Sequence, residues 1–226
     1  TAGVDRATGV PIATTFPELK FPALQRATLK NGTKVILAER HDTPVVQFNA
    51  EFPGGFTSDG GRKAGTASFA MNMLDEGAGN YSAIQFGNRQ EQLGAIVSGS
   101  ASLDSAEVSL SALKENLAPS MALWADAILR ARFDAPDIER VKANWLAGIK
   151  QEKTQPSLMA LRVVGPLLYG DAHPYAIPYT GTGYEADIAG IERADLIAWR
   201  EEQLRPDTAT IMIVGDTTLA EVMPLL

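Results

Sequence analysis

An Asn-Gly pair at residues 31–32 is the strongest constraint on the fold, because it separates two runs of β-prone residues, 25–29 and 33–39. Asn and Gly adopt the backbone angles of tight hairpin turns at low cost. Two alternating runs, 95–101 and 106–113, are joined by the short segment Leu103-Asp104-Ser105 and indicate a second antiparallel pair. The sequence therefore predicts a mainly antiparallel sheet.

Helical periodicity accounts for much of the remaining sequence. Apolar residues three and four positions apart predict helices, and Ser82 and Pro136 are suited to begin two of them. The expected helices cover residues 65–74, 83–93, 114 or 116 to a break at 133–136, 136–149, 158–168 and 193–204, and further strands are expected at 45–52 and 208–214. Strands occur in hairpins and helices in runs, which favours an α+β domain with helices packed on one side of the sheet.

The two ends of the chain differ from its middle. Residues 1–22 contain Gly and Pro without an apolar period, which indicates an extended linker or arm, and residues 23–226 are expected to form one domain. Thr218 and Glu221 form a capping box for a helix that Leu226 cuts within about two turns. The chain also begins without Met. We therefore expect a piece of a longer protein.

Charge and composition exclude several classes of function. The chain has 27 acidic and 20 basic residues, a net charge of −7, and no evident basic patch, which makes a nucleic-acid partner unexpected. It contains no Cys, which excludes disulfides, thiolate zinc sites and a cysteine nucleophile. No apolar run approaches the roughly 20 residues of a membrane span. The first 15 residues do not have the pattern of a signal peptide.

The residues that could perform catalysis do not form a recognisable pattern. The chain has two histidines, and neither has a second ligand at helical spacing. We interpret His41 as a surface residue and His173 as a loop anchor. The acidic pair Asp75-Glu76 follows a predicted helix, where carboxylates are typically solvated. The serines of residues 98–105 lack a neighbouring base. From residue types and spacing alone, we find no catalytic site.

Several segments in a fixed order nevertheless resemble the M16 family of zinc metallopeptidases, the pitrilysin and insulinase family. These segments are 29–35, 44–46, Gly65-Thr66-Ala67-Ser68-Phe69-Ala70-Met71-Asn72-Met73-Leu74-Asp75-Glu76-Gly77, 168–170 with His173-Pro174-Tyr175, 180–181 and 211–216. The resemblance covers residues 21–226. It implies an M16-type α+β domain, the fold shared with LuxS and the mitochondrial processing peptidase.

In that family, an inverted His-x-x-Glu-His motif holds zinc and activates the attacking water. On this sequence, the three motif positions fall on Ser68, Met71 and Asn72, and the later Glu ligand falls on Ala147 or Gly148. None of these residues is a usual zinc ligand. The resemblance therefore implies a domain without catalytic residues or metal of its own.

The resemblance also implies partners. M16 proteins resemble clamshells made of two halves, and commonly one half keeps the zinc motif while the other encloses the peptide. This chain corresponds to the first domain of an inactive half, so we expect zinc in a catalytic partner half and a peptide as substrate. The strand that binds peptide in the active half corresponds to residues 95–102, which makes Ser98, Gly99 and Ser100 candidate peptide contacts. Bacterial relatives are often periplasmic, so a soluble, exported protein is expected.

Three other functions remain open at this stage. The chain could be a structural assembly subunit, related to the inactive M16 core proteins of respiratory complexes. It could be a hydrolase that uses unanticipated residues, or a peptide-binding module unconnected with proteolysis. Co-purification, metal analysis with a digestion assay, and peptide titration would distinguish these alternatives.

Overall fold

The structure is a computed structural model that describes residues 15–226 except 17, 19 and 171. Most of the predicted arm, residues 1–22, thus lies outside the described residues. Its described residues, 15, 16, 18 and 20–22, are exposed and belong to no helix or strand.

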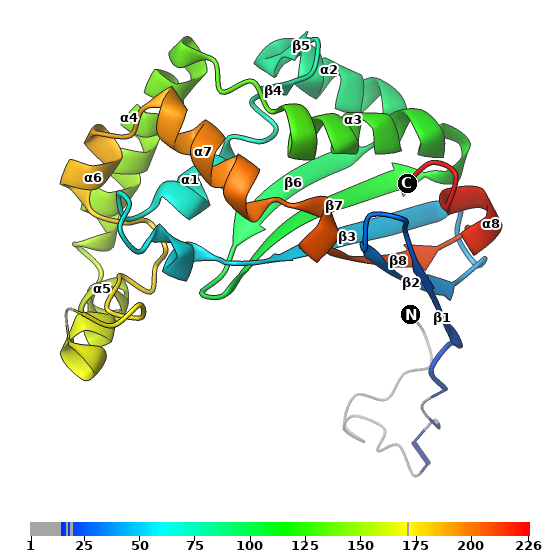
Figure 1. Ribbon diagram of the computed structural model, residues 1–226, viewed down its shortest axis with the longest axis horizontal. Helices are drawn as coiled ribbons and strands as arrows, with labels where there is room; N and C mark the ends of the chain where they lie inside the picture. The colour runs from blue at the N-terminus through cyan, green and yellow to red at the C-terminus, as the bar shows by residue number, and fades with distance from the viewer. Residues whose placement is uncertain (1–14, 17, 19, 171) are drawn as a thin grey trace, which may run out of the picture.

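A six-stranded sheet forms the centre of the molecule, in the order β1-β2-β8-β3-β7-β6 (Figure 1). Its strands are β1 Leu24–Thr28, β2 Lys34–Glu39, β3 Val45–Pro53, β6 Ile96–Ala101, β7 Ser105–Leu113 and β8 Thr210–Gly215. β1 and β2 form the hairpin predicted around Asn31-Gly32, and β6 and β7 form the second predicted pair. The last strand, β8, lies parallel to β2 and antiparallel to β3, so the sheet is mainly antiparallel, as expected.

Helices and short strands connect these elements. The helices are α1 Thr66–Asn72, α2 Ala83–Leu93, α3 Leu117–Arg130, α4 Ala135–Glu152, α5 Pro156–Tyr169, α6 Glu185–Ala189, α7 Arg193–Gln203 and α8 Leu219–Val222. Two short strands, β4 Gly77–Ala78 and β5 Tyr81–Ser82, pair with each other. The capping box expected at Thr218 and Glu221 is confirmed at α8, and a second one at Ser82 begins α2. The short elements β4, β5 and α6 were not predicted from the sequence.

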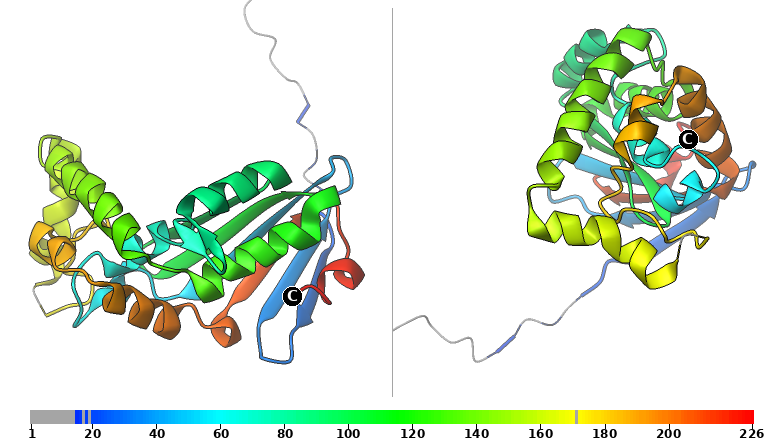
Figure 2. Two further views of the ribbon diagram at one scale, coloured as in Figure 1. Left: turned by 90° about the horizontal axis from the view of Figure 1, so that it is seen from above. Right: turned by 90° about the vertical axis from the view of Figure 1, so that its left-hand side faces the viewer.

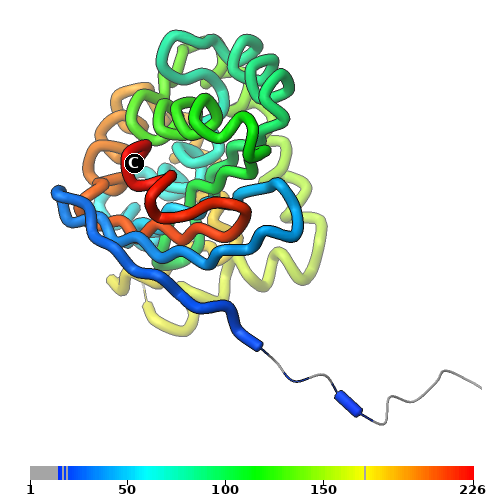
Figure 3. Tube along the Cα trace, turned by 90° about the vertical axis from the view of Figure 1, so that its right-hand side faces the viewer, coloured from blue at the N-terminus to red at the C-terminus, as the bar shows by residue number. Residues whose placement is uncertain are grey.

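The two faces of the sheet have different environments. Along β3, Val46, Phe48, Ala50 and Phe52 are buried, whereas Gln47 and Glu51, which point the other way, are exposed. The buried face is covered by α1, α2 and α3, and α4, α5 and α6 lie beyond one end of the sheet (Figures 1 and 2). Viewed from the opposite end, α2, α3 and the C-terminal residue lie on the same side of the strands (Figure 3).

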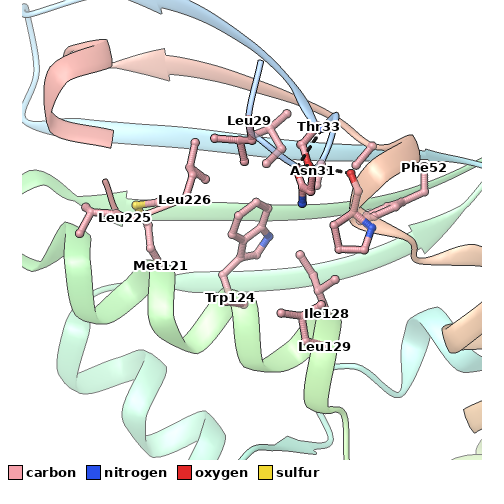
Figure 4. Close-up of a pocket in the computed structure, with 15 residues that line it drawn as sticks. Leu29, Asn31, Thr33, Phe52, Met121, Trp124, Ile128, Leu129, Leu225 and Leu226 are labelled. Carbon is pink, nitrogen blue, oxygen red and sulfur yellow. Dashed lines mark hydrogen bonds between the residues drawn. The ribbon is translucent and has the colours of Figure 1, made fainter. Parts of the chain in front are cut away.

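Trp124 on α3 joins the helix layer to the sheet. Its ring packs 5.8 Å from that of Phe48, and its Nε1–H donates to the carbonyl oxygen of Val108 at 3.1 Å. An apolar pocket remains between α3 and the sheet, lined among others by Leu29, Phe52 and Leu226 (Figure 4). At the rim of this pocket the hydroxyl of Thr33 is already hydrogen-bonded. The pocket therefore offers apolar contact and little polar chemistry.

Candidate functional site

The helix that carries the motif positions, α1, begins at a buried carboxylate. Asp59 accepts hydrogen bonds from the backbone N–H of Gly65 at 2.8 Å and of Ala67 at 2.9 Å. These bonds satisfy N–H groups that have no partner within the first turn of a helix. Asp59 is only 4% exposed, and this burial raises its pKa from 3.8 to about 6, although its hydrogen bonds act in the opposite direction.

This shift predicts a pH-dependent stability. Because the folded state binds a proton on Asp59 more tightly than the unfolded chain does, the contribution of Asp59 is greatest below pH ~4 and falls as the pH rises through 6. We expect the stability advantage of the wild type over Asp59→Asn to shrink between pH 4 and 7, by at most about 3 kcal/mol. Urea unfolding of both proteins across this range measures the difference. If the difference in unfolding free energy between the two proteins did not change with pH, the raised pKa of Asp59 would be contradicted.

The three motif positions lie in different environments on α1. Met71 is fully buried in the core, Ser68 is half-buried, and Asn72 is exposed. The Ser68 hydroxyl lies against Gly181, where a Cβ would come within 3.0 Å of its oxygen. The four-residue spacing of Ser68 and Asn72 keeps both on one side of the helix.

The fourth motif position lies on α4, which contacts α1 through aromatic rings. Trp145 packs edge-on against Phe69, with ring centroids 5.5 Å apart, and donates its Nε1–H to the carbonyl oxygen of Thr182 at 3.0 Å. Gly148, one turn further along α4, is exposed, and a Cβ there would meet no atom within 4 Å. The structure thus keeps α1 and α4 side by side without a polar contact between the motif positions.

The donor set at these positions does not fit zinc. A hydroxyl, a buried thioether, an amide and a glycine stand where imidazoles and carboxylates would be needed. Among the described residues, no three His, Cys, Asp or Glu side chains are placed to hold a metal ion. No step of a metal-dependent reaction can be assigned to these residues.

The strand next to α1 carries the candidate peptide contacts. β6 is the last strand in the sheet order, and it packs under α1 at Gly99, where a Cβ would come within 2.4 Å of the Met71 carbonyl oxygen. Ser98 and Ser100 point to the opposite face and are exposed, and the Ser98 hydroxyl lies 2.8 Å from that of Ser109. Gly99 therefore serves the packing of α1, whereas the two serines face solvent.

Two glycines at candidate positions predict opposite effects of the same substitution. We expect Gly99→Ala to lower the free energy of unfolding by about 1–3 kcal/mol, because the added methyl group meets backbone and α1 must move. Gly148→Ala should raise it by up to about 1 kcal/mol, because alanine favours an exposed helix and meets no neighbour. Thermal unfolding of both variants measures these effects. Equal effects would contradict this account of Gly99.

The face of the sheet that α1–α3 leave uncovered is hydrophilic over β3, β7 and β6. Side chains form hydrogen-bonded pairs between neighbouring strands there, which are Gln47–Ser111 at 2.7 Å, Asn49–Glu107 at 3.1 Å and Ser98–Ser109 at 2.8 Å. We refer to the part of this face formed by these six residues as the open polar face. A sheet face of this kind is suited to contact with water or with a polar ligand rather than to burial in a core.

A buried ion pair fixes the loop that follows α5. Arg162 on α5 is 6% exposed and donates to the carboxylate of Glu152 at 2.7 Å, to the Thr182 hydroxyl at 2.8 Å and to the Gly183 carbonyl at 2.6 Å. Thr182 also donates to Glu152 at 2.9 Å. Because the same loop accepts the Trp145 hydrogen bond and covers Ser68, the ion pair helps to hold α4 and α1 in place. Residue spacing gave no signal for this network, because its members meet only through the path of the chain from α4 to the loop after α5.

Three of the remaining candidates, His41, His173 and Glu76, have structural partners. His41 is exposed between Asp216 and Glu39, and these two hydrogen bonds, with the Asp216 bond the stronger, raise its pKa. The ring of His173 accepts the Tyr175 N–H at 3.0 Å and stacks on Tyr169, which bears out its interpretation as a loop anchor. Glu76 forms an ion pair with Arg140 on α4.

A family model and one solved structure identify the family of this chain. The sequence model of the insulinase family, peptidase family M16, matches residues 34–167. The search of curated proteins found no match to this chain. Within the described residues, no helix is both long and apolar enough to cross a membrane.

Several solved structures share the fold. A peptidase M16 inactive domain from Pseudomonas fluorescens has a TM-score of 0.84 and 27% sequence identity, over 90% of this chain and 49% of that one. A protease from Helicobacter pylori has a TM-score of 0.76 and 20% identity, over 91% and 49% of the two chains. The periplasmic protease PqqL from Escherichia coli has a TM-score of 0.77 and 17% identity, over 89% and 23%. The chain thus spans about half, or less, of these structures.

Proposed function

The chain belongs to peptidase family M16, and from this premise we propose that it is a non-catalytic domain that forms part of the wall of a proteolytic chamber. In this role it encloses peptide and contacts a separate, zinc-bearing half. The observation that carries the proposal is the combination of an M16 fold with motif positions occupied by Ser68, Met71, Asn72 and Gly148. The likeness to an M16 domain described as inactive supports the same conclusion.

The open polar face supports the role of a chamber wall. A wall of an enclosed, water-filled space needs hydrophilic side chains on its inner surface, and the hydrogen-bonded pairs across β3, β7 and β6 provide them. Ser98 and Ser100 point to this side and are exposed, which supports contact between their hydroxyl groups and an enclosed peptide. Gly99 would contribute through its backbone, as an extended peptide pairs with the edge of a sheet.

The partner half would supply the chemistry. Zinc held by the catalytic half would supply a Lewis acid that lowers the pKa of a water and polarises the peptide carbonyl. The likeness to a periplasmic protease is the basis for proposing an exported location.

Metal analysis and peptide cleavage test this function together. We expect the chain alone to hold well under one zinc per molecule and to cleave no peptide in an unfolded-protein digest. Added to the M16 subunit or half that carries the His-x-x-Glu-His motif in the same organism, it should form a complex and raise the rate of cleavage. Stoichiometric zinc or cleavage by the chain alone would refute the proposal. A stable complex with unchanged cleavage would instead indicate the structural subunit.

A further inference from the structure

The edge of β6 that faces away from β7 is partly hydrogen-bonded to another segment of the chain. Backbone N–H groups along an antiparallel strand point alternately toward and away from the neighbouring strand. The N–H of Ser102 donates to the Ser105 carbonyl oxygen across the hairpin, whereas that of Val97 donates to the side-chain oxygen of Gln90 on α2 at 2.6 Å. By this alternation, the N–H groups of Gly99 and Ala101 point to the same side as that of Val97.

Gln90 contributes a second acceptor at this edge. Its backbone carbonyl oxygen accepts the N–H of Ala95, the residue before β6, at 2.9 Å. One residue thus supplies carbonyl-type oxygens to Ala95 and Val97, two positions apart on one side of the strand. This is the pattern with which an added strand would pair. Gln90 is half-buried, so its side chain is held between α2 and the sheet rather than extended into solvent.

We infer that Gln90 takes the place of a partner strand at Ala95 and Val97. It thereby prevents an extended peptide from pairing with this part of the β6 edge. An added strand is then confined to Gly99 and Ala101. Unpaired sheet edges attract other strands, and proteins block them by several means, such as charged side chains, proline, bulges or a covering helix or loop. The Gln90 side chain, which accepts the edge N–H of Val97, would act to the same effect. The inference does not rest on the proposed function, since it concerns the edge of this chain by itself.

Amide hydrogen exchange tests the contact. Gln90→Ala removes the acceptor without disturbing α2, because alanine is the best helix former. We expect the Val97 amide to exchange at least about fivefold faster in this variant. Gln90→Glu keeps an acceptor oxygen, so the Val97 amide in this variant should exchange at the wild-type rate. Gln92→Ala, which shortens an exposed amide side chain on the same helix, is the matched control and should leave Val97 unchanged.

Peptide titration tests the closure. The probe is a hexapeptide of alternating threonine and valine with blocked ends, followed by amide chemical shifts of residues 95–101. In the wild type, we expect any shifts to be confined to Gly99 and Ala101. In Gln90→Ala, they should extend to Ala95 and Val97, with binding at least about tenfold tighter. Equal binding by both proteins, no binding by either, wild-type shifts at Val97, or unchanged Val97 exchange would each overturn the inference.

Discussion

Replacing Arg162 by alanine is expected to lower the free energy of unfolding by about 3–5 kcal/mol, because it leaves the Glu152 carboxylate, which is only 14% exposed, without its cation. The Gly183 carbonyl and the Thr182 hydroxyl lose a donor in the same change. This is a large part of the roughly 5–15 kcal/mol that stabilises a typical domain. Chemical denaturation of the purified variant measures the loss.

Three further variants make this result specific. Arg205→Ala breaks an exposed ion pair with Asp207 and should change stability by less than about 1 kcal/mol. Arg162→Lys keeps the charge but not the planar fork of donors, so it should fall between wild type and alanine. Arg162→Met combined with Glu152→Leu removes both charges and should recover much of the loss. A loss under 1 kcal/mol for Arg162→Ala would show that the network does not hold the loop.

Introducing glutamate at Met71 is expected to unfold the chain or to lower the free energy of unfolding by more than about 4 kcal/mol. Met71 is fully buried in the core, so a carboxylate there would lose its hydration and gain no compensating charge. By the resemblance to M16 sequences, Met71 falls where active members of the family have the Glu that activates water. In this chain Met71 is part of the core.

Two neighbouring substitutions serve as controls for this prediction. Met71→Leu conserves volume and should cost less than about 1.5 kcal/mol. Asn72→His, at the adjacent exposed motif position, should alter stability by about 0.5 kcal/mol or less. If Met71→Glu were as stable as the wild type, the position would open to water, and the description of α1 as a core helix would be wrong.

Much of the fold could be predicted from local signals. The Asn31-Gly32 turn, the alternation along residues 106–113, the helix start at Ser82 and the capping box at Thr218 depend on interactions within a few residues, and the structure confirms all of them. The place of β8 between β2 and β3 could not be predicted in this way. Its pairing joins residues about 170 positions apart, and the sequence pattern of a strand does not specify its neighbours.

The candidate site was predictable in part. The spacing of Ser68, Met71 and Asn72 follows from the resemblance to M16 sequences, and their residue types already exclude a zinc site of the family kind. The surroundings of these three residues could not be predicted from the sequence. Nothing in the sequence indicated that Asp59 would cap α1 or that Gly99 would lie against the Met71 carbonyl. Contacts between distant segments depend on the path of the whole chain.

Residue types and their spacing were enough to predict the class of fold, the family and the kinds of atom at each motif position, because turn chemistry, periodicity and residue identity are local properties. The three-dimensional arrangement settled which polar groups are buried together. It paired Arg162 with Glu152, placed the Gln90 carboxamide on the edge of β6, and separated a polar face of the sheet from its apolar one. The physical reason is that burial and long-range hydrogen bonds arise only when segments far apart in the chain meet.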